Sequence, residues 1–187
     1  MVLASAGAEI VAGLFFGLSL RFFVIALQIA GTIAAQSTSL SQIFGGSVSI
    51  DPLPAIGNIL MVSGLALAVL MGLHVHLAKF MINSYQLVPA GTLPEANTIA
   101  QVGLLEVSRC FALAFTLSAP FLVASLIYNI TLGVINRAMP QLMVAFVGAP
   151  AITAGGLALL ALSAPILLGI WADRFSDALV TPFGPLP

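Results

Sequence analysis

The feature that most constrains this chain is the length of its segments without charge. Asp, Glu, Lys and Arg are absent from residues 22–50, 52–78, 110–136 and 138–172. Each of these segments exceeds the roughly 20 residues that a helix needs to cross the hydrocarbon of a membrane. The spacing of the charges therefore predicts long membrane helices and an all-α membrane-associated protein.

The composition agrees with this prediction. The chain is 60% hydrophobic and 6% charged, with a mean hydropathy of +1.18, whereas soluble domains carry about 25% charged residues. We therefore expect an integral membrane protein or a subunit buried in a membrane-associated assembly. A net charge of −1 and the lack of interleaved basic and aromatic residues exclude nucleic-acid binding.

The single cysteine, Cys110, excludes an intrachain disulfide and a cysteine-based metal site, and we expect it to pack on a helix. The N-terminus has no positive region before its first apolar run, so no cleaved signal peptide is expected.

The apolar runs predict four helical regions separated by turn signals. They are an early helix at 4–35, a helix at 57–85, and kinked helical regions at 98–135 and 140–178. Pro120 should kink or divide the third region, giving one piece near 98–118 and another near 121–135. The last region should also bend, because it contains Pro150 and Pro165.

A stripe of small and polar residues follows one side of the early helix. Glu9, Gly13, Gly17 and Arg21 occur at steps of four, and Gln28 returns to the same side. Glycines at this spacing let helix backbones approach closely, and charges at membrane depth usually face a partner or a wet cavity. The stripe is expected to face protein, although glycine is also simply common in membrane helices.

The segment 36–56 reads QSTSLSQIFGGSVSIDPLPAI and predicts a loop of some twenty residues. Loops of this length are uncommon unless they act as lids or binding loops or are disordered. Irregular backbone exposed to lipid would leave amides unsatisfied, so the loop must lie in water, in protein or along a cavity.

The remaining polar groups are better explained by helix packing than by catalysis or ligand binding. Glu106 and Arg109 lie three residues apart, so they can pair along a helix, with a proton relay as the alternative. His74 and His76 are two apart and point some 200° away from each other on a helix, so no metal site and no cofactor are expected.

The positive-inside rule leads to a conflict. The loop at 36–56 lacks Lys and Arg and reads as non-cytoplasmic, so the following helix would return Lys79 to the cytoplasm. A single further crossing would place Arg137 on the wrong side. Either the third region doubles back at Pro120, or these helices do not span the bilayer in the usual alternating way.

The stretch INRAMPQLMVAFVGAP at 135–150, with the preceding TLGV, strongly resembles the FliR family of flagellar type III export-gate proteins. The virulence-secretion counterparts of that family are the SctT proteins. Further matches are EIVAGLFFGLSLRFFVIALQIAG at 9–31, the Asp-Pro at 51–52, and His74 with the later LVPAG. The family usually carries about two more apolar helices upstream, so the resemblance implies a late start or a shortened protein.

The resemblance implies a single FliR-like domain over 1–187, built of bent and broken helical hairpins. It implies a non-enzymatic subunit of the flagellar export gate in the bacterial inner membrane, at the flagellar basal body. The implied partners are FliP-like and FliQ-like subunits, an FlhB-like subunit, membrane lipid, and the unfolded flagellar proteins that are exported. Such gates are conical and raised out of the membrane plane, which would remove the topology conflict.

The resemblance also assigns roles to residues. The loop at 36–56 would be a pore plug formed by Ile43, Phe44, Gly45 and Gly46, with an ordinary external loop as the alternative. The residues expected to pack against other subunits are Glu9, Gly13, Gly17, Arg21, Glu106 and Arg109.

The stretch INRAMPQL would form the turn of a helical hairpin through Asn136, Arg137, Pro140 and Gln141. Pro140 would start the last helix, where its missing N–H costs little. Asn136 and Gln141 would satisfy free backbone groups at the helix ends.

Other functions stay open at this level. A small secondary transporter could use Glu106 and Arg109 in broken helices to bind a solute, and an injectisome gate subunit is close to the flagellar one. An intramembrane enzyme is third, because GxSxG, HEXXH and paired catalytic carboxylates are absent from the sequence.

Overall fold

The computed structural model describes residues 2–39, 55–93, 95–139 and 144–180, and over these residues the chain is helical without a β-strand. The helices are α1 (Val2–Ser39), α2 (Ala55–Leu70), α3 (Leu73–Leu87), α4 (Ala96–Ala138) and α5 (Val144–Val180). The all-α prediction is confirmed.

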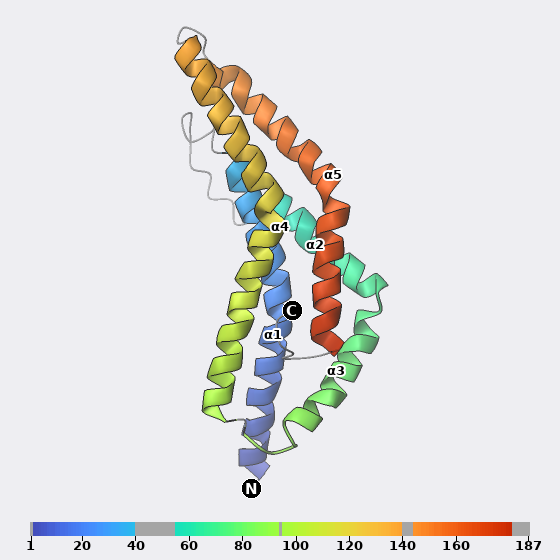
Figure 1. Ribbon diagram of the computed structural model, residues 1–187. Helices are drawn as coiled ribbons and strands as arrows, with labels where there is room; N and C mark the ends of the chain where they lie inside the picture. Colours follow the sequence, from blue (N-terminus) through green and yellow to red (C-terminus); the bar gives the residue numbers. More distant parts are fainter. Residues whose placement is uncertain (1, 40–54, 94, 140–143, 181–187) are drawn as a thin grey trace.

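The molecule is elongated because three of its helices are long. α1, α4 and α5 have 38, 43 and 37 residues, and at a rise of 1.5 Å per residue α4 alone is about 65 Å long. α4 runs alongside α1, and α5 returns from the far end of α4 to lie near α3 (Figure 1). The long helices are thus about twice the roughly 30 Å of membrane hydrocarbon.

The early helix is longer than predicted. α1 continues to Ser39 instead of ending at residue 35, so the first residues of the expected loop are helical. The Ser37 and Thr38 hydroxyls donate to the Ala34 carbonyl at 2.8 and 3.1 Å. These hydroxyls bond to the backbone of the preceding turn, so polar residues continue the helix here. Residues 40–54 of the predicted loop lie outside the described residues.

The single helix predicted at 57–85 is wrong, because it is two helices. α2 and α3 are separated at Met71 and Gly72 and meet at an angle of 77°. Gly72 has a φ of 81°, a left-handed conformation that glycine adopts at little cost. The apolar pattern runs unchanged through this position, so periodicity alone did not reveal the break.

Of the kink or division predicted at Pro120, the division is wrong. α4 is continuous from Ala96 to Ala138 with Pro120 inside it, which excludes a third region that doubles back there. A proline removes one backbone N–H donor, and membrane helices tolerate this loss when neighbouring groups compensate. Pro150 and Pro165 likewise lie within α5, and that helix changes direction part-way along, as the sequence predicted (Figure 1).

The core lies where the second half of α1 meets α2, α4 and α5. Its largest fully buried side chains are Trp171, Phe121, Leu27, Leu60 and Leu117. The ring of Trp171 stacks on Phe175 with centroids 5.0 Å apart, and Phe175 meets Phe23 edge-on at 5.4 Å. Aromatic pairs of this kind add to the stabilisation from buried area.

The outer surface carries many large apolar side chains, as membrane or subunit contact requires. On α4 they form a stripe along the helix that includes Phe111, Phe115, Leu122, Leu126 and Ile130, all between 38% and 60% exposed. Within the part of the chain that the structure describes, three helices are long and apolar enough to cross a membrane, or up to four spans if the bent pair α2 and α3 counts as one.

Candidate functional site

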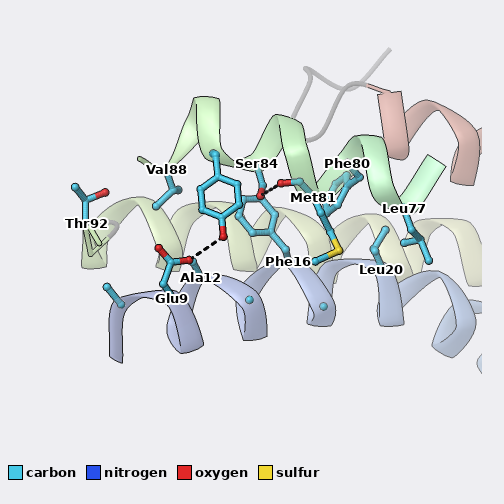
Figure 2. A pocket seen from close by; sticks show the side chains of 14 residues that line it. Glu9, Ala12, Phe16, Leu20, Leu77, Phe80, Met81, Ser84, Val88 and Thr92 are labelled. Carbon is cyan, nitrogen blue, oxygen red and sulfur yellow. Dashed lines mark hydrogen bonds between the residues drawn. The ribbon is translucent and has the colours of Figure 1, made fainter. Parts of the chain in front are cut away.

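An open groove separates the first half of α1 from α3 (Figure 2). Its volume is about 470 Å³, and Glu9 lies at one end while Leu20 and Leu77 lie at the other. Apart from Glu9, the lining is apolar or small and uncharged. It consists of Ala8, Ala12, Gly13, Phe16, Gly17, Leu20, Leu77, Phe80, Met81, Ser84, Tyr85, Val88 and Thr92.

Glu9 ties α1 to the end of α3 and the turn that follows it. Its carboxylate accepts a hydrogen bond from the Tyr85 hydroxyl at 3.2 Å and one from the Gly91 backbone N–H at 2.9 Å. Gly91 has a φ of 75° and so holds the turn in a left-handed conformation. The prediction that Glu9 faces protein is therefore met within the chain, but Tyr85 and Gly91 were not foreseen as its partners.

Gly13 and Gly17 do not bring two helices of this chain together. A Cβ added at either position would have no atom within 4 Å, and no Cα of α1 lies within 8 Å of α3. The rings of Phe16 and Phe80, edge-on at 5.5 Å, bridge the gap between the two helices. Both glycines are open over the described residues, and Arg21, one turn further, is exposed.

The close helix contact lies further along α1. A Cβ on Gly31 would collide with the backbone of Gly57, so α1 and α2 touch through their main chains. Ala26, Ala30 and Ala34 are all 0–1% exposed along the same half of α1. Small residues at steps of four were present in the sequence here too, so the same pattern that drew attention to Gly13 could have found this contact.

Two helices bond to neighbouring carbonyls of α1. The Trp171 indole N–H donates to the Phe23 carbonyl at 2.9 Å, and the Cys110 thiol donates to the Phe22 carbonyl at 3.2 Å. Trp171 is 1% exposed and is the one tryptophan of the chain. A lone large aromatic with a polar N–H was a usable signal for a packing centre, but sequence reasoning did not use it.

Glu106 and Arg109 form the pair that their spacing predicted. Arg109 Nη1 lies 2.7 Å from Glu106 Oε1, and Glu106 is 5% exposed. The pair lies on α4 against Phe22 and Phe23 of α1. Pairing lowers the cost of a charge at membrane depth, so this geometry favours packing over the binding of a solute by either charge.

The two histidines lie apart from any cluster of metal ligands. His74 is exposed and His76 half-buried on α3. Over the described residues, no three His, Cys, Asp or Glu side chains come together in a way that could hold a metal ion.

Asn136 and Arg137 belong to a helix instead of a turn, which corrects the sequence prediction. Both are exposed in the last turn of α4, which the Met139 N–H closes by donating to the Ile135 carbonyl at 2.8 Å. The helix can extend through these residues because a cation such as Arg137 suits a helix C-terminus. Pro140 and Gln141 lie outside the described residues.

The proposed plug residues also lie outside the described residues. They are Ile43, Phe44, Gly45 and Gly46.

Comparison with known proteins gives one family and several relatives. The bacterial export proteins, family 1, match residues 1–178. The flagellar biosynthetic protein FliR of Caulobacter vibrioides is 32% identical over 172 residues, which cover 91% of this chain and 68% of that protein. The proteins of the same name from Escherichia coli and Aquifex aeolicus are 26% and 27% identical over 90% of this chain. The chain covers 65% and 66% of their lengths, so it spans about two thirds of these curated relatives.

Proposed function

Because the chain belongs to the bacterial export proteins, family 1, we propose that it is a subunit of the flagellar type III protein export gate. In this function it helps to form and seal the channel through which unfolded flagellar proteins cross the bacterial inner membrane, at the flagellar basal body. The observation that carries the proposal is the family match over residues 1–178.

The architecture supports a role in a helical assembly. α4 is about 65 Å long at 1.5 Å per residue and carries apolar side chains on its outer face. A helix of this length exceeds the hydrocarbon of a flat membrane and has room for both lipid and neighbouring subunits. The continuous α4 has no hairpin at Pro120, and this supports the proposal that the helices do not span the bilayer in simple alternation.

The partners that we propose are FliP-like and FliQ-like gate subunits and an FlhB-like subunit. Co-expression of the tagged chain with these subunits, followed by purification in mild detergent, tests the proposal. We expect a stable complex whose native mass contains the other subunits. A chain that is always recovered alone, while the other subunits assemble with one another, would overturn the proposal.

The region around Arg137 is proposed to dock against a neighbouring subunit. The double substitution Arg137→Ala and Gln141→Ala should reduce the recovery of the complex, because Arg137 is exposed at the end of α4. Arg174→Ala is the matched control, since it removes an exposed arginine from another helix. Equal recovery of the double variant and the control would contradict the docking role.

The segment at 36–56 is proposed to contribute the pore plug through Ile43, Phe44, Gly45 and Gly46. The support is its sequence, since apolar side chains exclude water and glycines permit movement. Shortening residues 42–48 should make resting cells that contain the assembled gate leak small ions. Unchanged permeability in cells that assemble the shortened chain would count against the plug.

A further inference from the structure

Helix α3 is bounded by two glycines in the left-handed conformation. Gly72 directly precedes it with a φ of 81°, and Gly91 lies in the turn after it with a φ of 75°. The angle between α2 and α3 is 77°. Such positions lack a Cβ and change conformation with little steric penalty, so they suit the ends of a segment that moves as a unit.

Only side chains join α3 to α1. No Cα of one helix lies within 8 Å of the other, and the groove of about 470 Å³ separates them. The connections are the edge-on rings of Phe16 and Phe80 and the hydrogen bond from Tyr85 to Glu9. The contact between Gly31 and Gly57 differs, because there two helix backbones pack directly against each other with no room for a Cβ on Gly31.

We propose that α3 is a hinged arm that pivots at Gly72 and is latched against α1 by Glu9. In the latched state, the Glu9 carboxylate holds both Tyr85 at the end of α3 and the N–H of Gly91 in the next turn. In the released state, α3 rolls on its contact with α5 and moves away from α1, and the groove between α1 and α3 widens. The motion is a property of this chain and does not depend on the proposed function.

The latch has the exposure that a reversible contact requires. Tyr85 is 52% exposed, and Gly91 is exposed as well. Neither partner lies in the buried core, so the two hydrogen bonds can open without disturbing the packing around Trp171. The ion pair of Glu106 and Arg109 differs, because Glu106 is buried at 5% exposure and would lose its partner inside the protein.

Release of α3 would change which side chains the first half of α1 exposes. Phe16 is 8% exposed and Phe80 is 3% exposed in the latched state. Moving α3 outward would uncover both rings beside the glycine face of Gly13 and Gly17, which has no atom within 4 Å of an added Cβ even now. The arm therefore controls access to an apolar surface on α1.

Spin-label distances in lipid nanodiscs test the latch. In a Cys110→Ala background, labels at Ala6 and Gln86, both exposed, report the separation of α1 and α3. Labels at Ala6 and Ala100 report α1 and α4 at the same end of the molecule.

Glu9→Ala should lengthen the first distance by more than about 5 Å, the length of one helical turn, and leave the second unchanged. Tyr85→Phe should shift the first distance in the same direction by less, since it removes one of the two bonds. A first distance that does not change in Glu9→Ala would overturn the latch. Equal broadening of both distances would also overturn it, because that result means fraying of α1.

The hinge needs a separate measurement. Gly72→Ala should shift the distance between labels at Val62 and Asn83, because an alanine is strained at a φ of 81°. Gly103→Ala is the matched control, since Gly103 lies within α4 and an added Cβ there meets nothing within 4 Å. A Gly72→Ala distance equal to that of the control would overturn the hinge.

Discussion

The two halves of α1 use small residues in opposite ways. In the second half, Gly31 touches the backbone of Gly57, and Ala26 and Ala30 are fully buried. In the first half, Gly13 and Gly17 face an open groove, and side chains alone connect α1 to α3. Small residues permit close packing but do not produce it, and the partner must also be small at the crossing point. Gly57 meets that condition, whereas the first half meets Phe80.

We call the second half of α1 with its contacts the closed half, and the first half with its groove the open half. The largest expected effect comes from Trp171, the packing centre of the closed half. Trp171→Ala should lower the free energy of unfolding by about 3–5 kcal/mol, because it leaves a cavity and removes the donor to the Phe23 carbonyl. Denaturant titration in detergent, followed by circular dichroism, measures this loss. A change below about 1 kcal/mol would mean that the closed half is no more tightly packed than the open one.

A matched pair of alanine substitutions compares the two halves directly. Gly31→Ala should destabilise by about 2–3 kcal/mol, because its Cβ meets the Gly57 backbone. Gly17→Ala should be neutral or stabilise by up to about 1 kcal/mol, since the site is open and alanine favours a helix. Fluorescence of Trp171, the one tryptophan, monitors both unfolding transitions. Equal effects would remove the distinction between the halves.

The charge pair beside the closed half should contribute less. Glu106→Gln should destabilise by about 1–2 kcal/mol, because it takes the carboxylate away from Arg109. A double-mutant cycle with Arg109→Gln isolates the coupling between the two side chains. Zero coupling in that cycle would show that Arg109 does not stabilise the buried Glu106 carboxylate.

The smallest effect is expected in the open half. Tyr85→Phe should change the free energy of unfolding by less than about 1 kcal/mol, because its hydroxyl bond to Glu9 is exposed. The same denaturant titration detects the change, with Gly31→Ala as the reference for a closed contact. A loss as large as that of Gly31→Ala would mean that the α1–α3 connection is a structural core and not an open groove.

Sequence patterns predicted the features that depend only on residues close together in the chain. The lengths of the segments without charged residues predicted the long helices. The three-residue spacing of Glu106 and Arg109 predicted their ion pair. Both features depend on residues within one helix. The family resemblance was recognised from contiguous residues for the same reason, and the match over residues 1–178 supports it.

The errors arose where two helices decide the outcome. Pro120 is a strong local breaker, but α4 continues through it. Gly72 lies in an unbroken apolar pattern, yet the chain turns by 77° there. Neither the partner of Gly31 nor the emptiness around Gly17 can be read from one helix, because each depends on which residue the neighbouring helix places opposite.

The hydrogen bonds that the Phe22 and Phe23 carbonyls accept influence how α1 moves when it is pulled. Consecutive carbonyls point about 100° apart around a helix axis, so Cys110 of α4 and Trp171 of α5 reach α1 from two directions at one level. Rotating α1 about its axis, or sliding it by one residue, would remove both bonds together. A pull on the N-terminal half therefore tilts or bends α1 about this level at less cost than it rotates or slides the helix there, because only the latter motions break both bonds.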